Sequence, residues 1–447
     1  MELGMKFVFF SIILITLLSE AELNPSKRSI FFNKINKSLT NFLLNFLFPK
    51  EPGILRVKNS EEARAVNKVT TLDFMGLVER HGYPSEEHYV TTEDGYNLKI
   101  HRIPDSPLSN NKQPKIVMLF IHGILSSSDS WVLFGPKKDL AFLLADQGYD
   151  IWFGNYRGNS YCRSHVKMSP YDAKFWEYSY HDVGTKDLPA TIDYVLNYTK
   201  SETLYYIGHS MGTTSFFVLL STKPEYNAKI KLGTCLAPVA FWKETSPVFK
   251  FFFNLTPQIK EFLDNNNIYE LFSLSSTSIT AGRKLCADEA ITQALCITIF
   301  SLIAGSDPAQ FNTTVFPEIL SYYPAGTSLK SFVHYYQNGI TGNFQTFDYG
   351  NLGNYERYKQ LTPVKYNVKK ITAPIAMFYG DNDPITLKSN VLQLYKQLPN
   401  VILLEEIPYR LFTHMDFLWS IDGKALLYDR VIEVMQEFES GSNTSFR

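Results

Sequence analysis

Residues 205–217 read YYIGHSMGTTSFF, and this stretch decides how the chain is expected to fold. An apolar run typical of a strand leads into Gly-x-Ser-x-Gly, and small, then apolar, residues follow at helical spacing. Gly208 and Gly212 flank a tight turn where a side chain would collide with the strand or the helix. The pattern predicts a strand, a sharp turn and a helix, with Ser210 held above the sheet edge as a nucleophile.

Strands and helices alternate on both sides of this turn. Residues 116–121 form a continuous apolar run, which is typical of a strand buried on both faces. Residues 87–103 alternate around a Glu-Asp-Gly turn and predict a hairpin. The alternation stops at about residue 241 and resumes at 371, with further strands at 371–380 and 401–407. The pattern predicts an α/β fold with a mostly parallel, doubly wound sheet and a helical insertion above it.

The same boundaries divide the chain into segments. We expect a signal peptide over 1–21, a linker or pro-segment over 22–71, core segments over 72–240 and 369–440, the insertion over 241–368, and a tail over 441–447.

The first 21 residues have the features of a secretory signal peptide. One cation precedes a twelve-residue apolar run over 7–18, and Ser19 and Ala21 suit a cleavage site. A signal anchor is the alternative, although the run is short for a membrane span. We expect a secreted or lysosomal protein with no transmembrane segment in the mature chain. Five glycosylation sequons fit this route: Asn36, Asn197, Asn254, Asn312 and Asn443.

Composition narrows the possible partners and cofactors. A formal net charge of −1 provides no basic surplus for nucleic acid, and 45% hydrophobic residues indicate a folded globular protein. Cys286 and Cys296 are close enough in sequence to form a disulfide in an oxidising compartment, whereas Cys235 suits a buried apolar position. No Cys or His cluster has metal-ligand spacing, so we expect neither a metal nor an organic cofactor. The oligomeric state stays open.

Three residues in the expected order complete a hydrolytic site. A serine needs a histidine to remove its proton and a carboxylate to orient that histidine, and on such sheets the order is Ser, acid, His. Only His334 and His414 follow Ser210, and His334 lies within the insertion. We therefore predict His414 as base, with Asp383 as its acid and Asp381 as the alternative.

Acyl transfer also requires amide donors for the developing oxyanion. The Met211 N–H directly follows the nucleophile. The loop after the first buried parallel strand should supply the second donor, and Gly123 there allows close approach of the backbone. We predict Ile124 N–H as that donor, with His122 bracing the loop.

The chain resembles the acid lipases of the gastric and lysosomal type within the α/β-hydrolase fold. The matching phrases, in family order, are residues 82–84, 92–96, 103–104, 122–125, 156–159, 187–193, 208–214, 236–238, 380–383 and 414–417. The resemblance implies the same triad and oxyanion donors, a disulfide in the insertion, and a cap whose lid covers the site. Met211 stands where many members have Gln, but its backbone amide is the group required.

The resemblance implies hydrolysis of neutral-lipid esters, triacylglycerol or sterol ester, at a lipid–water interface through an acyl-serine intermediate. Two other functions remain open from the sequence. One is a short-chain carboxylesterase, and the other is a lipid-binding protein that keeps this fold without turnover.

Overall fold

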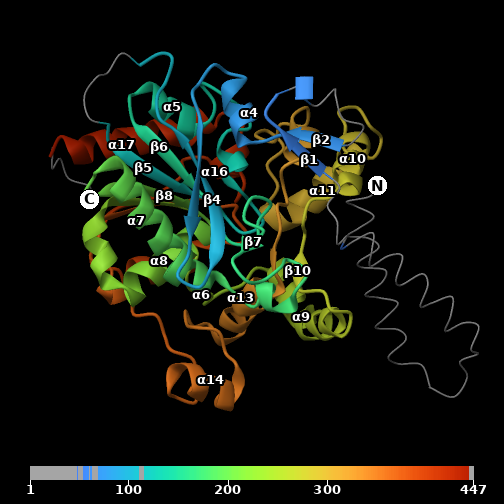
Figure 1. The fold of residues 1–447 in the computed structure, drawn as a ribbon, viewed down its shortest axis with the longest axis vertical. Helices are drawn as coiled ribbons and strands as arrows, with labels where there is room; N and C mark the ends of the chain where they lie inside the picture. The colour runs from blue at the N-terminus through green and yellow to red at the C-terminus, as the bar shows by residue number, and fades with distance from the viewer. Residues whose placement is uncertain (1–47, 49–53, 60, 63–68, 110–114, 442–447) are drawn as a thin grey trace, which may run out of the picture.

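The computed structural model describes residues 48, 54–59, 61–62, 69–109 and 115–441. A central sheet runs through these residues (Figure 1), and its order is β13-β12-β9-β8-β5-β6-β4-β3, with β7 paired to β4. The strands are β3 (Glu86–Thr91), β4 (Tyr96–Ile103), β5 (Val117–Ile121), β6 (Asp150–Gly154), β7 (Ser164–His165), β8 (Leu204–His209), β9 (Ile230–Leu236), β12 (Ile375–Tyr379) and β13 (Val401–Glu406).

The strand pairing confirms the predicted α/β class. The six consecutive strands from β13 to β6 pair in parallel, whereas β3, β4 and β7 are antiparallel additions at one edge. Because the carboxyl ends of parallel strands share one edge of a sheet, the loops after β5, β8, β12 and β13 open on the same side. Those loops carry the predicted site residues.

Strand β5 explains why its sequence is apolar at every position. Met118 and Phe120 pack into the hydrophobic cluster on one face of the sheet, while Val117, Leu119 and Ile121 pack into the cluster on the other. Successive strand side chains point to opposite faces, so a strand covered on both faces has no polar side.

Helices cover both faces (Figure 1). One cluster joins the sheet to α4 (Phe74–Glu79), α5 (Leu140–Asp146), α16 (Asp416–Trp419) and α17 (Asp429–Glu439). The other joins it to α6 (Tyr180–Asp182), α7 (Leu188–Thr199), α8 (Met211–Thr222) and α15 (Lys388–Tyr395). These helices occupy the positions that a doubly wound sheet requires.

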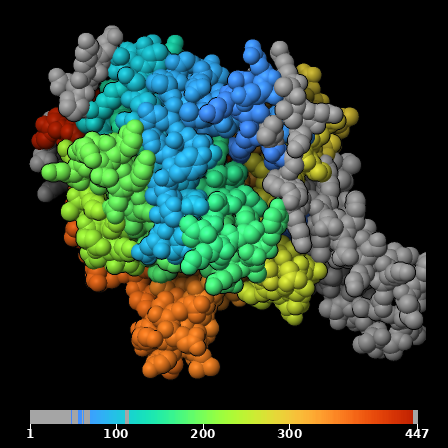
Figure 2. Space-filling view, in the orientation of Figure 1, coloured from blue at the N-terminus to red at the C-terminus, as the bar shows by residue number. Residues whose placement is uncertain are grey.

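Residues 241–368, where the sequence analysis places the insertion, are mainly helical and are called the cap below. Its elements are α9 (Pro247–Asn265), β10 (Glu270–Leu271), α10 (Ser276–Leu285), α11 (Gln293–Ala304), α12 (Phe316–Ile319), β11 (Thr327–Ser328), α13 (Leu329–Thr341) and α14 (Gly350–Tyr358). The two short strands pair antiparallel. Figure 2 shows the orange atoms around α14 as a lobe that protrudes from the body.

Two paired strands at residues 54–57 and 69–72, called the N-terminal ribbon below, precede the first core helix. The folded domain therefore begins earlier than residue 72, where the sequence led us to expect its start. Strands β1 (Ile54–Val57) and β2 (Val69–Leu72) pair in parallel. Arg56 donates to Asp129 Oδ2 at 2.8 Å and to Tyr161 Oη at 2.7 Å. These partners lie 73 and 105 residues away in sequence. The folded body therefore includes residues from the segment expected to be a linker or pro-segment.

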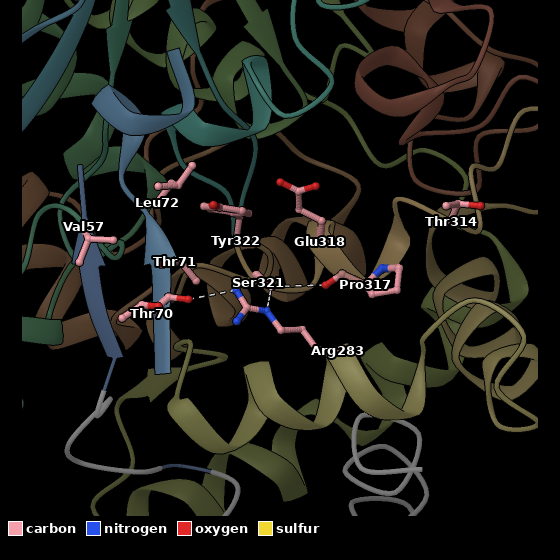
Figure 3. Close-up of a pocket in the computed structure, with 10 residues that line it drawn as sticks. All are labelled: Val57, Thr70, Thr71, Leu72, Arg283, Thr314, Pro317, Glu318, Ser321 and Tyr322. Atoms are coloured by element: carbon pink, nitrogen blue, oxygen red, sulfur yellow. Dashed lines mark hydrogen bonds between the residues drawn. The ribbon is translucent and has the colours of Figure 1, made fainter. Parts of the chain in front are cut away.

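A surface cavity of about 460 Å³ separates this ribbon from the cap (Figure 3). Arg283 of α10 spans it, donating to the Thr70 carbonyl at 3.1 Å and to Ser321 Oγ at 3.0 Å. None of the three predicted catalytic residues lines it. Arg283 thus links the cap to the ribbon away from the predicted site.

A buried ion-pair network fixes the loop after β6. The Arg157 guanidinium donates to Asp187 Oδ1 at 2.8 Å and to Asp94 Oδ2 at 2.7 Å, and it lies 4.0 Å from the centre of the Tyr96 ring. Arg157 and Asp187 are buried. Burial alone would raise the pKa of Asp94, but the charged hydrogen bonds from Arg157 hold it well below its usual range. The network joins the hairpin, the β6 loop and the start of α7.

We expect Arg157→Met to lower the free energy of unfolding by about 3–5 kcal/mol, because it leaves the Asp187 carboxylate buried without its cation. Urea unfolding monitored by circular dichroism measures this loss. Lys186→Met is the matched control, since Lys186 also binds Asp94, at 3.0 Å, but is more exposed. The control should cost less than about 1 kcal/mol. Equal losses in the two variants would contradict a role specific to the buried pair.

Candidate active site

Ser210 sits on the turn between β8 and α8, as the sequence predicts. Its backbone has φ 53° and ψ −117°, a conformation that is strained for a residue with a side chain. A Cβ on Gly212 would lie 2.5 Å from the Ile121 carbonyl oxygen, and one on Gly208 would lie 3.0 Å from the Gly212 carbonyl carbon. The two glycines therefore allow the close approach that supports the strained serine.

The structure brings Ser210, His414 and Asp383 together from three loops. Ser210 Oγ donates to His414 Nε2 at 2.8 Å, and His414 Nδ1 donates to Asp383 Oδ2 at 2.7 Å. All three residues are buried, with exposures of 5%, 3% and 2% respectively. This arrangement places a proton acceptor on the hydroxyl and a carboxylate behind that acceptor.

Asp383 is held by the backbone of its own loop. Its Oδ1 accepts from the amides of Ile385 and Thr386, at 2.8 and 2.9 Å. Burial alone would raise the pKa of Asp383, but the adjacent His414 and these hydrogen bonds lower it below its ordinary value. The other candidate, Asp381, is exposed. The geometry therefore favours Asp383 as the partner of His414.

His209 adds a link that the sequence analysis did not assign. Its Nε2 donates to the backbone carbonyl of His414 at 3.0 Å, so the nucleophile turn is bonded to the base loop. Burial lowers the pKa of His209 to about 3, which keeps the ring neutral. The position of His209 beside Ser210 could have suggested a role in the site. Its partner could not be predicted from the sequence, because the carbonyl that it contacts is 205 residues away.

The expected oxyanion loop packs against the nucleophile. A Cβ on Gly123 would lie 3.1 Å from Ser210 Cβ, so this backbone passes directly beside the serine. Met211 is the first residue of α8, and its N–H has no acceptor within that helix. His122 Nδ1 donates to the Gly123 carbonyl at 2.8 Å, and burial lowers its pKa to about 4. A neutral His122 thus braces the loop that leads to Ile124.

The cap contacts both halves of the candidate site. The Ala325 amide donates to the Leu125 carbonyl at 2.6 Å, next to the expected oxyanion loop. Tyr335 of α13 donates to Thr214 Oγ1 at 3.0 Å, four residues after Ser210. Trp242 lies 6.0 Å from the Tyr335 ring and 5.6 Å from Phe253 of α9. These rings form an aromatic run from the cap to the nucleophile helix.

The other predicted sites fall in different parts of the molecule. Cys286 and Cys296 form a disulfide with their Cα atoms 5.8 Å apart, linking the end of α10 to α11. Cys235 is buried, as expected. Asn197 and Asn254 are exposed, and Asn312 is half-buried. The signal peptide, Asn36 and Asn443 lie outside the described residues.

No helix among the described residues has both the length and the apolar character needed to cross a bilayer. The same residues contain no group of three or more His, Cys, Asp or Glu side chains arranged to hold a metal ion.

The chain is similar to known proteins over most of its length. Residues 74–135 match the model of the partial alpha/beta-hydrolase lipase region, and residues 116–419 match the alpha/beta hydrolase fold. Lipase 1 of Drosophila melanogaster is 38% identical over 85% of this chain and 83% of its own. Human gastric triacylglycerol lipase is 35% identical over 82% of this chain and 92% of its own, and human lipase member K is 35% identical over 83% and 92%.

Proposed function

Because this chain belongs to the alpha/beta-hydrolase lipase family and is an ester-hydrolysing lipase, we propose that it cleaves neutral-lipid esters through an acyl-Ser210 intermediate. One observation carries the proposal: hydrogen bonds of 2.8 and 2.7 Å connect Ser210 to His414 and His414 to Asp383. In this role Ser210 is the nucleophile, His414 the general base and Asp383 the orienting acid.

In the acylation step, the Ser210 oxygen attacks the ester carbonyl carbon while His414 Nε2 takes the hydroxyl proton. The Asp383 carboxylate keeps the proton on Nδ1, so Nε2 is free to accept. The carbonyl oxygen becomes an oxyanion, and the amides of Ile124 and Met211 stabilise it by roughly 3 kcal/mol each. The protonated His414 then gives its proton to the departing alcohol.

In the deacylation step, water replaces the alcohol. His414 removes a proton from the water, whose oxygen attacks the acyl carbonyl, and the fatty acid leaves as Ser210 regains its proton. Since all three side chains are buried, substrate entry requires the cap to open. We assign the opening movement to the cap because its segments at Ala325 and Tyr335 contact the loops around the nucleophile.

The aromatic run of Phe253, Trp242 and Tyr335 supports long acyl chains as the substrate class. Each methylene buried against such rings contributes about 0.8 kcal/mol, or roughly a fourfold gain in affinity. The chain's similarity to a gastric triacylglycerol lipase supports triacylglycerol as the neutral lipid, with sterol ester as the other candidate. The expected signal peptide and sequons support a secreted or lysosomal location.

We expect kcat/KM for soluble monomeric esters to rise by about threefold to fourfold per methylene between acetate and octanoate, because the acyl chain enters the cap. We also expect fatty acid release from a long-chain triacylglycerol emulsion. Titration of released acid measures both. A flat or falling chain-length profile without release from the emulsion would identify a short-chain carboxylesterase. No turnover of any ester would favour a lipid-binding protein and overturn the proposal.

A further inference from the structure

A short cap segment, residues 304–311, is bonded to the loops that carry both the acid and the base. The Ala304 carbonyl accepts the His414 amide at 3.1 Å, and the Ser306 carbonyl accepts Asn382 Nδ2 at 2.9 Å. Gly305 between them has φ +99°, and a Cβ there would lie 2.7 Å from the Asn382 carbonyl oxygen. This segment thus fixes the relative positions of the two loops.

Two buried carboxyl groups meet where this segment crosses the base loop. Asp307 follows α11 in the cap, and Asp416 begins α16, two residues after His414; they are 4% and 6% exposed. Both side chains line the same cavity of about 20 Å³, and Asp307 is one of the groups that raise the pKa of Asp416. Asp416 Oδ2 also accepts the Thr413 amide at 2.6 Å, directly before the base.

One of the two carboxyl oxygens of Asp307 has no hydrogen-bond donor among the described residues. Its Oδ1 accepts from the Ala309 and Gln310 amides and from Tyr409 Oη at 3.0 Å. Its Oδ2 is buried and has no hydrogen-bond partner among the described groups. Two ionised carboxylates both accept and cannot bond to each other, whereas one proton between them supplies the missing donor.

Resting on the proposed function of His414, we propose that Asp307 and Asp416 share one proton and act as positioning residues, a carboxyl clasp that holds the base loop in place. The clasp closes in acid. When both carboxyls ionise, two like charges face each other in a buried site, and the cap segment separates from the base loop.

The surroundings of the clasp favour the form in which Asp307 and Asp416 share one proton. Tyr409 and Tyr428 interact with the clasp, and Asp422 and Asp139 act on the same two tyrosines. The His414 ring is bonded to Ser210 and Asp383. No Lys, Arg or His of the described chain forms an ion pair with either carboxyl. Burial, reinforced by Asp307, raises the pKa of Asp416 to about 7.

The sign of the pH effect follows from this raised pKa. In the unfolded chain the Asp416 carboxyl ionises near its ordinary value of about 3.9, whereas the folded protein keeps the proton to about pH 7. The folded state therefore binds more protons between these values, and its stability falls as pH rises through them. Below about pH 4 the contribution of the clasp is complete.

Asp307→Asn tests the clasp, because an amide supplies the donor at every pH while its oxygen keeps the backbone bonds. The pH at which kcat falls by half on the alkaline side, for a soluble ester, should rise by about one unit or more. KM and the acid limb should stay unchanged. Asp422→Asn is the matched control: Asp422 binds the same cap segment through Gln310 at 3.0 Å but is exposed. It should keep the wild-type profile.

Thermal unfolding against pH gives a readout that does not depend on catalysis. The melting temperature of the wild type should fall between about pH 4 and 7 relative to Asp307→Asn. If Asp307→Asn does not fold, Asp416→Asn is measured in its place. Parallel melting curves and identical alkaline limbs would overturn the clasp. Loss of all Ser210-dependent hydrolysis would instead overturn the proposed function, while the melting curves would still test the shared proton.

Discussion

Replacing Ser210 by alanine is expected to lower kcat for ester hydrolysis by a factor of roughly 10⁵ to 10⁶. In the proposed mechanism the Ser210 oxygen forms the acyl bond, so the substitution removes the nucleophile while His414 and Asp383 stay in place. Substrate binding should change little, because the hydroxyl makes its decisive interaction during the reaction. Pre-steady-state measurements with a chromogenic ester in excess over enzyme report the loss of the burst of released alcohol.

The control for this experiment is Ser221→Ala. Ser221 is another buried serine of α8, and its hydroxyl donates to the Val218 carbonyl of the same helix at 3.2 Å. Its substitution should leave turnover at the wild-type level. If Ser210→Ala kept wild-type turnover while folded, hydrolysis would not proceed through Ser210, and the triad assignment would fail.

The sequence was sufficient to predict the nucleophile turn because steric requirements there are local. Gly208 and Gly212 lie within two residues of the serine, and a side chain on either would collide with backbone atoms. The core strands could also be predicted from the sequence, since a strand covered on both faces is apolar at every position. His414 followed from chain order alone, because one histidine after Ser210 follows a late strand.

Contacts between distant residues explain what the sequence did not predict. The N-terminal ribbon depends on Arg56 meeting Asp129, and a four-residue strand has too little periodicity to identify. The carboxyl clasp joins Asp307 to Asp416 across the boundary between cap and core. Neither aspartate lies in a sequence motif that would indicate this role. Only the folded structure shows that Asp307 Oδ2 lacks a donor. Pairings of this kind are properties of the tertiary structure.

The choice between two acids was also made by tertiary geometry. Asp381 and Asp383 both follow β12, and the sequence offered only loop length to separate them. The structure turns Asp383 inward, where two backbone amides hold one oxygen and His414 binds the other. The lowered pKa of Asp383 means that its stabilising contribution is lost only as pH falls through a value below its ordinary one, about 3.9. Protonation of Asp383 should therefore not limit activity above that value.

Asp383→Asn is expected to lower kcat by a factor of about 10⁴ with little change in fold. An asparagine oxygen can keep the bonds from Ile385 and Thr386, but its NH₂ group then faces His414 Nδ1 as a donor. That contact favours the tautomer with the proton on Nε2, which cannot accept the Ser210 proton. The effect should appear in kcat and kcat/KM together, because it removes an interaction needed in the transition state.

Asp381→Asn is the matched control for this variant, because it makes the same chemical change two residues away on an exposed side chain. It should retain wild-type kcat and the wild-type pH profile. If the losses were reversed, with Asp381→Asn inactive and Asp383→Asn active, Asp381 rather than Asp383 would be the partner of His414 in the working enzyme. The His414 ring would then need to turn from a carboxylate 2.7 Å away toward one at the surface. The buried, hydrogen-bonded position of Asp383 is the reason we propose it, rather than Asp381, as the acid that stabilises the charged imidazole.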